Sequence, residues 1–181
     1  INIYYMKNIL WALAVALAFV VHSCSPQSGL DSKVTHQLVE SDSFTFMAKR
    51  ANTSSYDVIN IMNSLPNTSS SRMLQLDYGY TIVVKKDEIT VTLPYFGRMY
   101  NPSFDRDKNS FRFTTKDFVF KKNQDSKGKW LISIEPKDVQ HVSIINIEVF
   151  KNGNAFVSIN ASDRQPITYD GYIMQNEILK K

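Results

Sequence analysis

Residues 145–159 read Ile-Asn-Ile-Glu-Val-Phe-Lys-Asn-Gly-Asn-Ala-Phe-Val-Ser-Ile. On each side of Asn152-Gly153, aliphatic residues recur at every second position, as they do in a β-strand that buries one face. Asn and Gly both tolerate a positive φ, so this dipeptide is typical of a tight hairpin turn. The stretch therefore predicts two antiparallel strands joined by a two-residue connection.

The same alternation recurs along most of the chain, with turn-forming residues between the segments. The clearest example is residues 74–84, where the apolar and aromatic side chains all fall on one face. The expected strands are 44–48, 74–84, 89–93, 111–113, 118–120, 130–134, 145–149, 155–159 and a last strand from 167 to about 173. Such a run predicts an antiparallel meander that closes into a barrel or forms a two-sheet sandwich. The length of 74–84 favours the barrel, because an open edge of that length invites aggregation.

One short helix is predicted ahead of the strands. Asp31 can cap it, and Leu30, Val34 and Leu38 recur every four residues before it ends at about Glu40. These three residues are expected to form its buried face.

The segment after the first strand is less regular. Residues 52–71 leave helix and loop open, because Val58, Ile61, Met62 and Leu65 suit one or two helical turns. Residues 67–71, Asn-Thr-Ser-Ser-Ser, predict a loop. No repeat or second boundary occurs, so residues 31–181 are expected to form one β-rich domain.

Residues 1–23 have the layout of a secretory signal peptide. Lys7 gives a positive start, and Ile9–Val21 is an uninterrupted apolar run. A helix of that length spans about 20 Å, less than the roughly 30 Å of a hydrocarbon core. Residues 1–5 precede Met6, where such a peptide would begin, so they are expected to lie upstream of the true start.

The end of this segment, Val21-His22-Ser23-Cys24, resembles the lipobox of bacterial lipoproteins. The resemblance implies cleavage before Cys24 and attachment of lipid to its thiol. Cys24 is also the single cysteine of the chain, so it cannot form an internal disulfide. We therefore expect a lipid-anchored protein in which residues 24–30 form a short tether to the membrane.

Location and charge narrow the possible partners. An acidic tract after the lipidated cysteine resembles a surface-export signal. Ser-Pro-Gln-Ser-Gly follows Cys24 instead, so we expect an outer-membrane protein whose domain faces the periplasm. The net charge of +4 is spread over single or paired Lys and Arg residues. A nucleic-acid-binding protein would concentrate that charge, so nucleic acid is not an expected partner.

Several segments resemble a known family when they are taken together. They are Phe44–Ala48 (Phe-x-Phe-x-Ala), Leu76–Tyr80, Leu93–Gly97 (Leu-Pro-Tyr-Phe-Gly) and Tyr169–Gly171. They resemble the uncharacterised domain of unknown function 4251, found in envelope lipoproteins of Gram-negative anaerobes, over roughly residues 32–173. The resemblance implies a lipocalin-like β fold preceded by a helix, and it implies no activity and no functional residues.

The residue inventory disfavours most enzyme chemistries. After cleavage the chain keeps only His36 and His141, and Cys24 is used by lipid, so neither a Cys-His pair nor a histidine zinc site can be assembled. No Gly-x-Ser-x-Gly elbow occurs. We expect both histidines to be ordinary surface residues, and we expect neither a cofactor nor catalysis.

Acidic residues leave two weaker candidates. Asp105-x-Asp107-x-Asn109 has calcium-loop spacing, but Ser110 stands where Gly is required, so an acidic loop without metal is expected. Asp77 and Asp170 could in principle form a carboxylate pair for hydrolysis.

The aromatic residues are the most distinctive candidates for a site. Tyr78 and Tyr80 share a strand face, and the turn after Pro94 supplies Tyr95, Phe96, Arg98 and Tyr100. One interpretation is that Tyr95 or Phe96 plugs one end of the barrel. The other is that all six line a pocket for an apolar or carbohydrate ligand.

These observations favour a non-enzymatic envelope lipoprotein that binds an apolar or carbohydrate ligand in its barrel. The first alternative is a structural or assembly partner of an envelope protein complex, which would expose a large apolar patch. The second alternative is a hydrolase that uses carboxylates.

Overall fold

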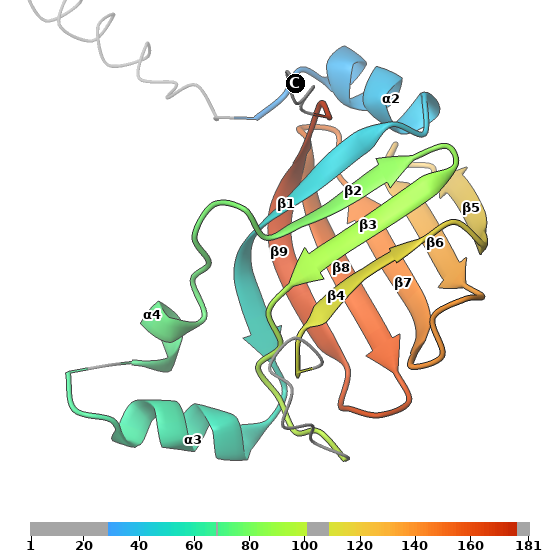
Figure 1. Ribbon diagram of the computed structural model, residues 1–181. Coiled ribbons are helices and arrows are strands. Elements are labelled where there is room, and N and C mark those ends of the chain that lie inside the picture. The colour runs from blue at the N-terminus through green and yellow to red at the C-terminus, as the bar shows by residue number, and fades with distance from the viewer. Residues whose placement is uncertain (1–28, 68, 101–108, 177–181) are drawn as a thin grey trace, which may run out of the picture.

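A single antiparallel sheet of nine strands curls into a nearly closed barrel (Figure 1). The computed structural model describes residues 29–67, 69–100 and 109–176. Its strands are β1 (Phe44–Thr53), β2 (Thr81–Lys85), β3 (Glu88–Leu93), β4 (Phe111–Thr115), β5 (Phe118–Gln124), β6 (Trp130–Pro136), β7 (Val142–Val149), β8 (Asn154–Ala161) and β9 (Ile167–Met174). Its helices are α2 (Ser32–Glu40), α3 (Tyr56–Ser64) and α4 (Ser70–Met73). The mainly β fold with one short helix ahead of the strands is confirmed.

The strand order is β4-β3-β2-β1-β9-β8-β7-β6-β5. Strands that are consecutive in sequence therefore pair in the sheet, with the exception of β4 and β5, and β1 also pairs with β9 and so joins the two halves of the meander. The hairpin at Asn152-Gly153 is confirmed, since Val149 pairs with Ala155 and Gly153 has φ +80°. Its connection is longer than the predicted two residues, because Phe150 N donates to the Asn154 carbonyl and Gly153 N to the Phe150 carbonyl.

The inside of the barrel is a packed apolar core. Residues with at most 2% exposure come from eight of the nine strands: Phe44, Phe46, Ile82, Val84, Ile89, Val91, Leu93, Phe111, Ile132, Ile134, Ile145, Ile147, Val149, Val157, Ile159, Ile167, Tyr169 and Ile173. Most of these residues have a solvent exposure of 0%. Each buried side chain of this size contributes about 2 kcal/mol of hydrophobic free energy.

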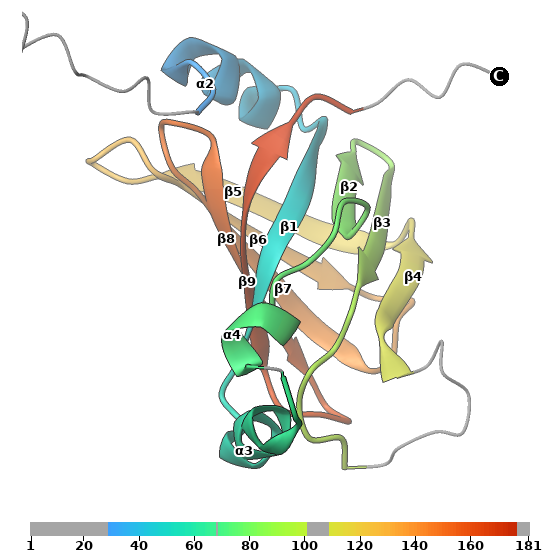
Figure 2. The ribbon, with the colours of Figure 1, turned by 90° about the vertical axis from the view of Figure 1, so that its left-hand side faces the viewer.

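One end of the barrel is covered by α2 (Figures 1 and 2). The Asp31 side chain accepts a hydrogen bond from the Lys33 amide at 2.7 Å, as the expected cap does. At the other end of the helix, Lys122 Nζ of β5 donates to the Val39 and Glu40 carbonyls and contacts Asp42 at 2.8 Å. A lysine at this position satisfies carbonyls that the helix leaves free, and it complements the negative end of the helix dipole.

The predicted buried face of this helix is wrong in part. Thr35 and Val39 are buried and Leu38 is half-buried, whereas Val34 is 41% exposed. The four-residue spacing of Leu30, Val34 and Leu38 is compatible with a helix, but it does not show which side the barrel covers.

The predicted strand over 74–84 is also wrong for most of its length. The strand β2 begins only at Thr81, because Gly79 has φ +113° and breaks the extended path. Before that point the chain runs along β1 as a loop, where Leu76 N donates to the Lys49 carbonyl and Ala51 N to the Leu74 carbonyl. Leu74 is buried and Leu76 and Tyr80 pack partly against the core from this loop, whereas Tyr78 is 69% exposed, so the alternation does not require a strand.

The two phenylalanine-rich strands on either side of Lys116 do not form the expected pair. The turn is present, but β4 and β5 diverge from it to become the two edges of the sheet. The segment between β1 and β2 forms α3 and then α4, so Ser70 and Ser71, expected in a loop, are helical. These two helices project from the barrel at the end away from α2 (Figures 1 and 2).

The β1–β9 pairing generates the first prediction. A Cβ atom at Gly171 would lie 2.1 Å from the Met47 carbonyl oxygen and 2.8 Å from the Phe46 ring. We expect Gly171→Ala to lower the free energy of unfolding by about 3 kcal/mol, because strand backbone cannot move aside as a flexible side chain can. Urea unfolding measures this loss. Ser158→Ala, on the outer side of β8, is the control and should change it by less than about 0.5 kcal/mol.

Candidate functional site

The turn after β3 closes the end of the barrel opposite α2. Residues 98–100 run antiparallel to residues 163–165, which connect β8 to β9. Gln165 N donates to the Arg98 carbonyl at 3.0 Å, and Tyr100 N donates to the Asp163 carbonyl at 2.8 Å. We call residues 94–100 and 163–165 the aromatic cap.

A buried arginine is the centre of the aromatic cap. Arg164 is 2% exposed, and its guanidinium lies 5.0 Å from the Tyr95 ring centre and 4.8 Å from that of Phe111. Its Nε and Nη2 donate to the two carboxylate oxygens of Asp163 at 2.9 and 2.8 Å. Stacking on rings and bidentate pairing are the two interactions for which a guanidinium is best shaped. The hydrogen bonds from Arg164 hold the pKa of Asp163 below its usual value.

Two tyrosine hydroxyls complete the cap. The Tyr95 hydroxyl lies 2.9 Å from the Arg98 carbonyl and 3.0 Å from the Gln165 carbonyl. The Tyr169 hydroxyl, inside the barrel, donates to the Pro94 carbonyl at 2.6 Å. Burial raises the pKa of both groups, and the positive charge of Arg164 opposes that rise. Both tyrosines therefore remain neutral hydrogen-bond donors that hold the turn in place.

The six predicted site residues do not gather in one pocket. Tyr95 and Phe96 are half-buried in the aromatic cap, while Arg98 and Tyr100 contribute backbone hydrogen bonds and expose their side chains. Tyr80 is half-buried just before β2, and Tyr78 is 69% exposed on the outside of the barrel.

Sequence reasoning missed the pair Asp163–Arg164 and the role of Tyr169. Asp-Arg-Gln-Pro has the composition of an exposed turn, and a buried arginine is rare enough that such a turn gives no signal for it. The alternation predicts a strand position for Tyr169, but it does not predict the hydrogen bond from its hydroxyl to the Pro94 carbonyl.

A groove lies where Tyr78 meets the outer face of β1, β2 and β3. Its volume is about 360 Å³, and Tyr78, Met47, Val83 and Met174 give it an apolar lining. Met47 is only 4% exposed although it points away from the core. Asn176 closes one side, where its amide donates to the Val84 carbonyl and the Ser43 hydroxyl.

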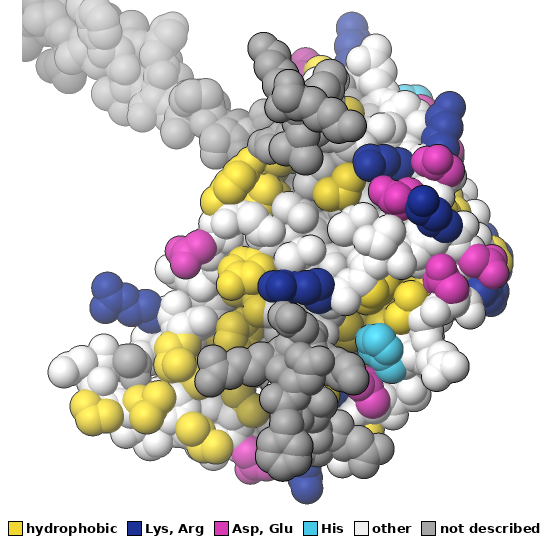
Figure 3. Space-filling view, in the orientation of Figure 1, with side chains coloured by type: hydrophobic (Ala, Val, Ile, Leu, Met, Phe, Trp, Pro, Cys, Tyr) yellow, Lys and Arg dark blue, Asp and Glu magenta, His cyan; other side chains and the backbone are white. Residues whose placement is uncertain are grey.

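An exposed apolar surface adjoins α3 and α4. Met62 is 6% exposed and Val58 is half-buried against the core, and both attach α3 to the barrel, whereas several other large apolar side chains are exposed. We call this set the apolar arm: Tyr56 (81% exposed), Ile61 (62%), Leu65 (44%), Met73 (37%) and Tyr78 (69%). Figure 3 shows the apolar side chains of these helices gathered at the lower left of the molecule.

The two acids of the candidate carboxylate pair, Asp77 and Asp170, are both exposed. Asp77 is exposed in the loop before β2, and Asp170 accepts a hydrogen bond from Asn52 at 2.9 Å. Glu148 lines the same shallow hollow as Asp170, but it pairs with Lys129 at 2.7 Å. Within the described ranges, no three His, Cys, Asp or Glu residues lie close enough together to hold a metal ion.

The two histidines make ring contacts. His36 lies edge-on to Trp130, with ring centres 5.4 Å apart, and His141 lies edge-on to Phe113 at 6.2 Å.

Residues 29–67, 69–100 and 109–176 contain no helix both long enough and apolar enough to cross a bilayer. Cys24, Asp105 and Asp107 lie outside the described residues.

The aromatic cap generates the second prediction. Asp163→Asn should lower the free energy of unfolding at pH 7 by about 3 kcal/mol, because it removes the carboxylate that pairs with the buried Arg164. The folded pKa of Asp163 is depressed, so its contribution is complete above the unfolded value of about 3.9 and is lost as pH falls through the folded value. Unfolding curves between pH 7 and pH 2 should therefore converge for the two proteins at acid pH. A gap that persists at pH 2, or that Asp170→Asn reproduces, would contradict this assignment.

Comparisons with known proteins agree with the sequence resemblance. A search among curated proteins gave no match. Among solved structures, the chain is similar to the crystal structure of a DUF4251 family protein from Bacteroides eggerthii DSM 20697, with a TM-score of 0.48 and 15% identity. That match covers 80% of this chain and 87% of the other. The family model for the domain of unknown function DUF4251 matches residues 27–173, so this chain belongs to the DUF4251 family.

Proposed function

We propose that this chain is a non-enzymatic envelope lipoprotein that binds a protein partner through the apolar arm. The observation that carries the proposal is the exposure of Tyr56, Ile61, Leu65 and Met73 on α3, α4 and the residue after α3, with Tyr78 exposed in the loop that follows α4. Isolated apolar residues are normal on a protein surface, but four large ones on a short helical projection, with a fifth close to it in sequence, mark a contact site. Tyr and Met are also enriched in the buried centres of protein interfaces.

The filled barrel favours a partner over a ligand in the interior. A small barrel holds either packed side chains or one small ligand. Ile145, Ile147 and Val157 have no exposed surface, so a ligand could enter only if the core were displaced. Displacing well-packed side chains costs several kcal/mol, which a small apolar ligand does not recover easily.

A second candidate is a ligand on the outside of the barrel. The groove at Tyr78 is apolar on its floor, and Thr81 and Thr90 add hydroxyls along its sides. This composition suits either an apolar ligand or a sugar ring, because an exposed tyrosine can stack on both. Tyr78 belongs to the groove and to the apolar arm, so a partner that covers the arm would extend into the groove.

Catalysis by carboxylates has less support. The pair formed by Glu148 and Asp170 lies on an exposed face, and each carboxylate already has a partner. A general acid or base for hydrolysis needs a site that shifts its pKa and excludes water.

The anchoring part of the proposal rests on the sequence before Ser25. The expected lipid on Cys24 would hold the domain at the envelope, in the outer membrane facing the periplasm by our proposal. Two or three acyl chains, at about 0.8 kcal/mol for each buried methylene, give stable attachment.

The partner proposal generates the third prediction. Ile61→Ser together with Tyr56→Ser should remove the co-purified partner when the tagged lipoprotein is isolated from detergent extracts of its own host. Both side chains are largely exposed, so the melting temperature should change little. The control is Val119→Ser with Tyr100→Ser, because both are exposed apolar or aromatic side chains outside the apolar arm. If the control pair loses the same partner, or if the arm variant retains it, the apolar arm is not the contact site.

The anchor generates the fourth prediction. Mass spectrometry of the mature N-terminus should find Cys24 as the first residue with lipid attached. Cys24→Ala should leave the leader uncut, because the signal peptidase that we invoke requires the modified cysteine. An intact leader on the natural sequence, with an unmodified thiol, would contradict the anchoring proposal.

A further inference from the structure

We propose that the end of the barrel carrying α2 rests on an anionic membrane surface, with Lys33, Lys127 and Lys151 facing the lipid phosphates. This inference rests on the proposed anchor at Cys24, and it adds an orientation to it. The evidence comes from where the chain leaves the barrel, from the charges around that point, and from the shape of the surface there.

The chain leaves the barrel beside the β7–β8 turn. Leu30 N donates to the Asn152 carbonyl at 2.9 Å, and the Leu30 side chain packs over Gly153. Only five peptide units separate Gly29 from Cys24, and they span at most about 17 Å when fully extended. A lipid on Cys24 would therefore hold this turn within one short tether length of the bilayer, while α3 and α4 project from the other end (Figure 1).

Three exposed lysines at this end, Lys33, Lys127 and Lys151, form no ion pair within the described residues, whereas Lys122 and Lys129 do. Of the acids there, Asp125 and Glu148 have partners, and Glu40 on α2 is exposed. The Asp125 carboxylate accepts hydrogen bonds from the backbone amides of Lys127 and Lys129, and these bonds lower its pKa. Glu148 pairs with Lys129 at 2.7 Å. Lys127 and Lys151 are exposed and form no ion pair within the part of the chain that the structure describes. Lys33 on α2 is exposed in the same way.

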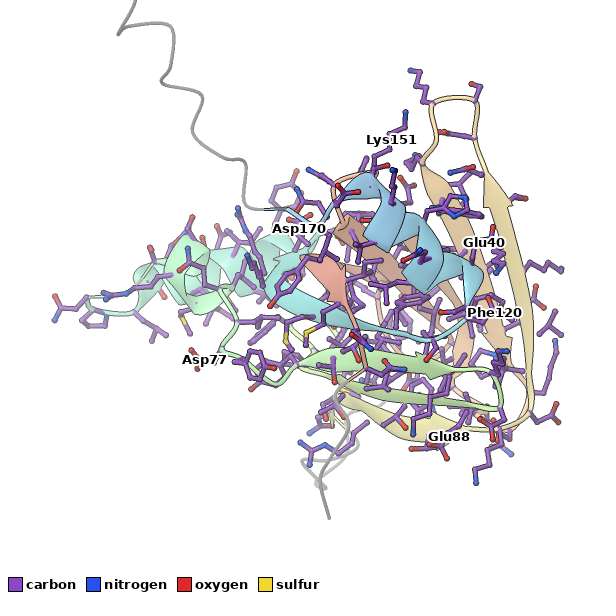
Figure 4. All side chains as sticks on the ribbon, turned by 90° about the horizontal axis from the view of Figure 1, so that it is seen from above. Glu40, Asp77, Glu88, Phe120, Lys151 and Asp170 are labelled. Atoms are coloured by element: carbon purple, nitrogen blue, oxygen red, sulfur yellow. The ribbon has the colours of Figure 1, made fainter. Side chains whose placement is uncertain are left out.

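The surface between these lysines is hollow and partly apolar. A depression of about 800 Å³ lies between the β5–β6 and β7–β8 turns, lined by Lys127, Lys129, Phe150 and Lys151. Phe150 is 43% exposed, and Val34 on α2 is 41% exposed. Figure 4 views this end directly and shows Lys151 pointing away from the barrel. Lysines beside exposed apolar side chains are the combination that binds the headgroup region of an anionic bilayer.

The test uses the mature chain, residues 24–181, with Cys24→Ser so that no acyl group contributes. Its buried core lies between Val39 and Ile173, so removal of the leader leaves that core complete. In a co-sedimentation assay at low salt, this chain should pellet with vesicles of 30% phosphatidylglycerol in phosphatidylcholine. It should stay in the supernatant with vesicles of pure phosphatidylcholine. Lys127→Gln with Lys151→Gln should weaken binding about 25-fold, because each lysine near the surface contributes about fivefold. Added salt should weaken binding as well.

The matched control is Arg50→Gln with Arg72→Gln, which removes the same charge near α3 and α4. This variant should bind the anionic vesicles within about twofold of the parent chain. Equal losses in both variants, or no binding to anionic vesicles, would overturn the inference. The mass of the natural N-terminus tests the anchor separately, so an acylated Cys24 with no vesicle binding refutes this inference alone. Vesicle binding by the test chain, together with an unmodified Cys24 in the protein purified from its own host, refutes the anchor alone.

Discussion

The pairing of the first strand with the last one is the constraint on which the rest of the molecule depends. Strands β2 to β4 and strands β5 to β9 form two meanders, and β1 must meet β9 across more than a hundred residues to join them before the sheet can curl and enclose its core. The contact leaves no room for a side chain at Gly171. Such long-range pairing lowers the entropy of the intervening chain before any contacts stabilise it. The barrel therefore depends on burial of its large apolar interior to offset that loss.

That interior accounts for where function is proposed. The core side chains fill the barrel, and α2 and the aromatic cap cover its two ends. We therefore propose binding sites on the outer surface and not in the interior. The two ends also differ in kind. One carries lysines beside the exit of the tether, and the other carries the apolar arm. A lipoprotein built in this way would rest on the membrane at one end and present its contact site to the periplasm at the other.

The hairpins could be predicted because turn-forming residues and alternation are local properties. Asn152-Gly153 and the strands around it follow from the sequence, as does the Asp31 cap. The loop over 74–80 could not be predicted, because Leu74, Leu76 and Tyr80 pack against the core from a loop at the same spacing as they would from a strand. Arg164 could not be placed either, since its burial depends on Phe111 and Tyr95, which are more than fifty residues away.

The barrel is a solid scaffold, and the binding surfaces that we propose lie outside it. Native mass spectrometry of the mature protein, purified from its own host, distinguishes this arrangement from a hollow barrel. We expect the mass of the acylated polypeptide, alone or with a protein partner, and no small molecule inside. A small molecule bound one to one, and released only when the barrel unfolds, would contradict it.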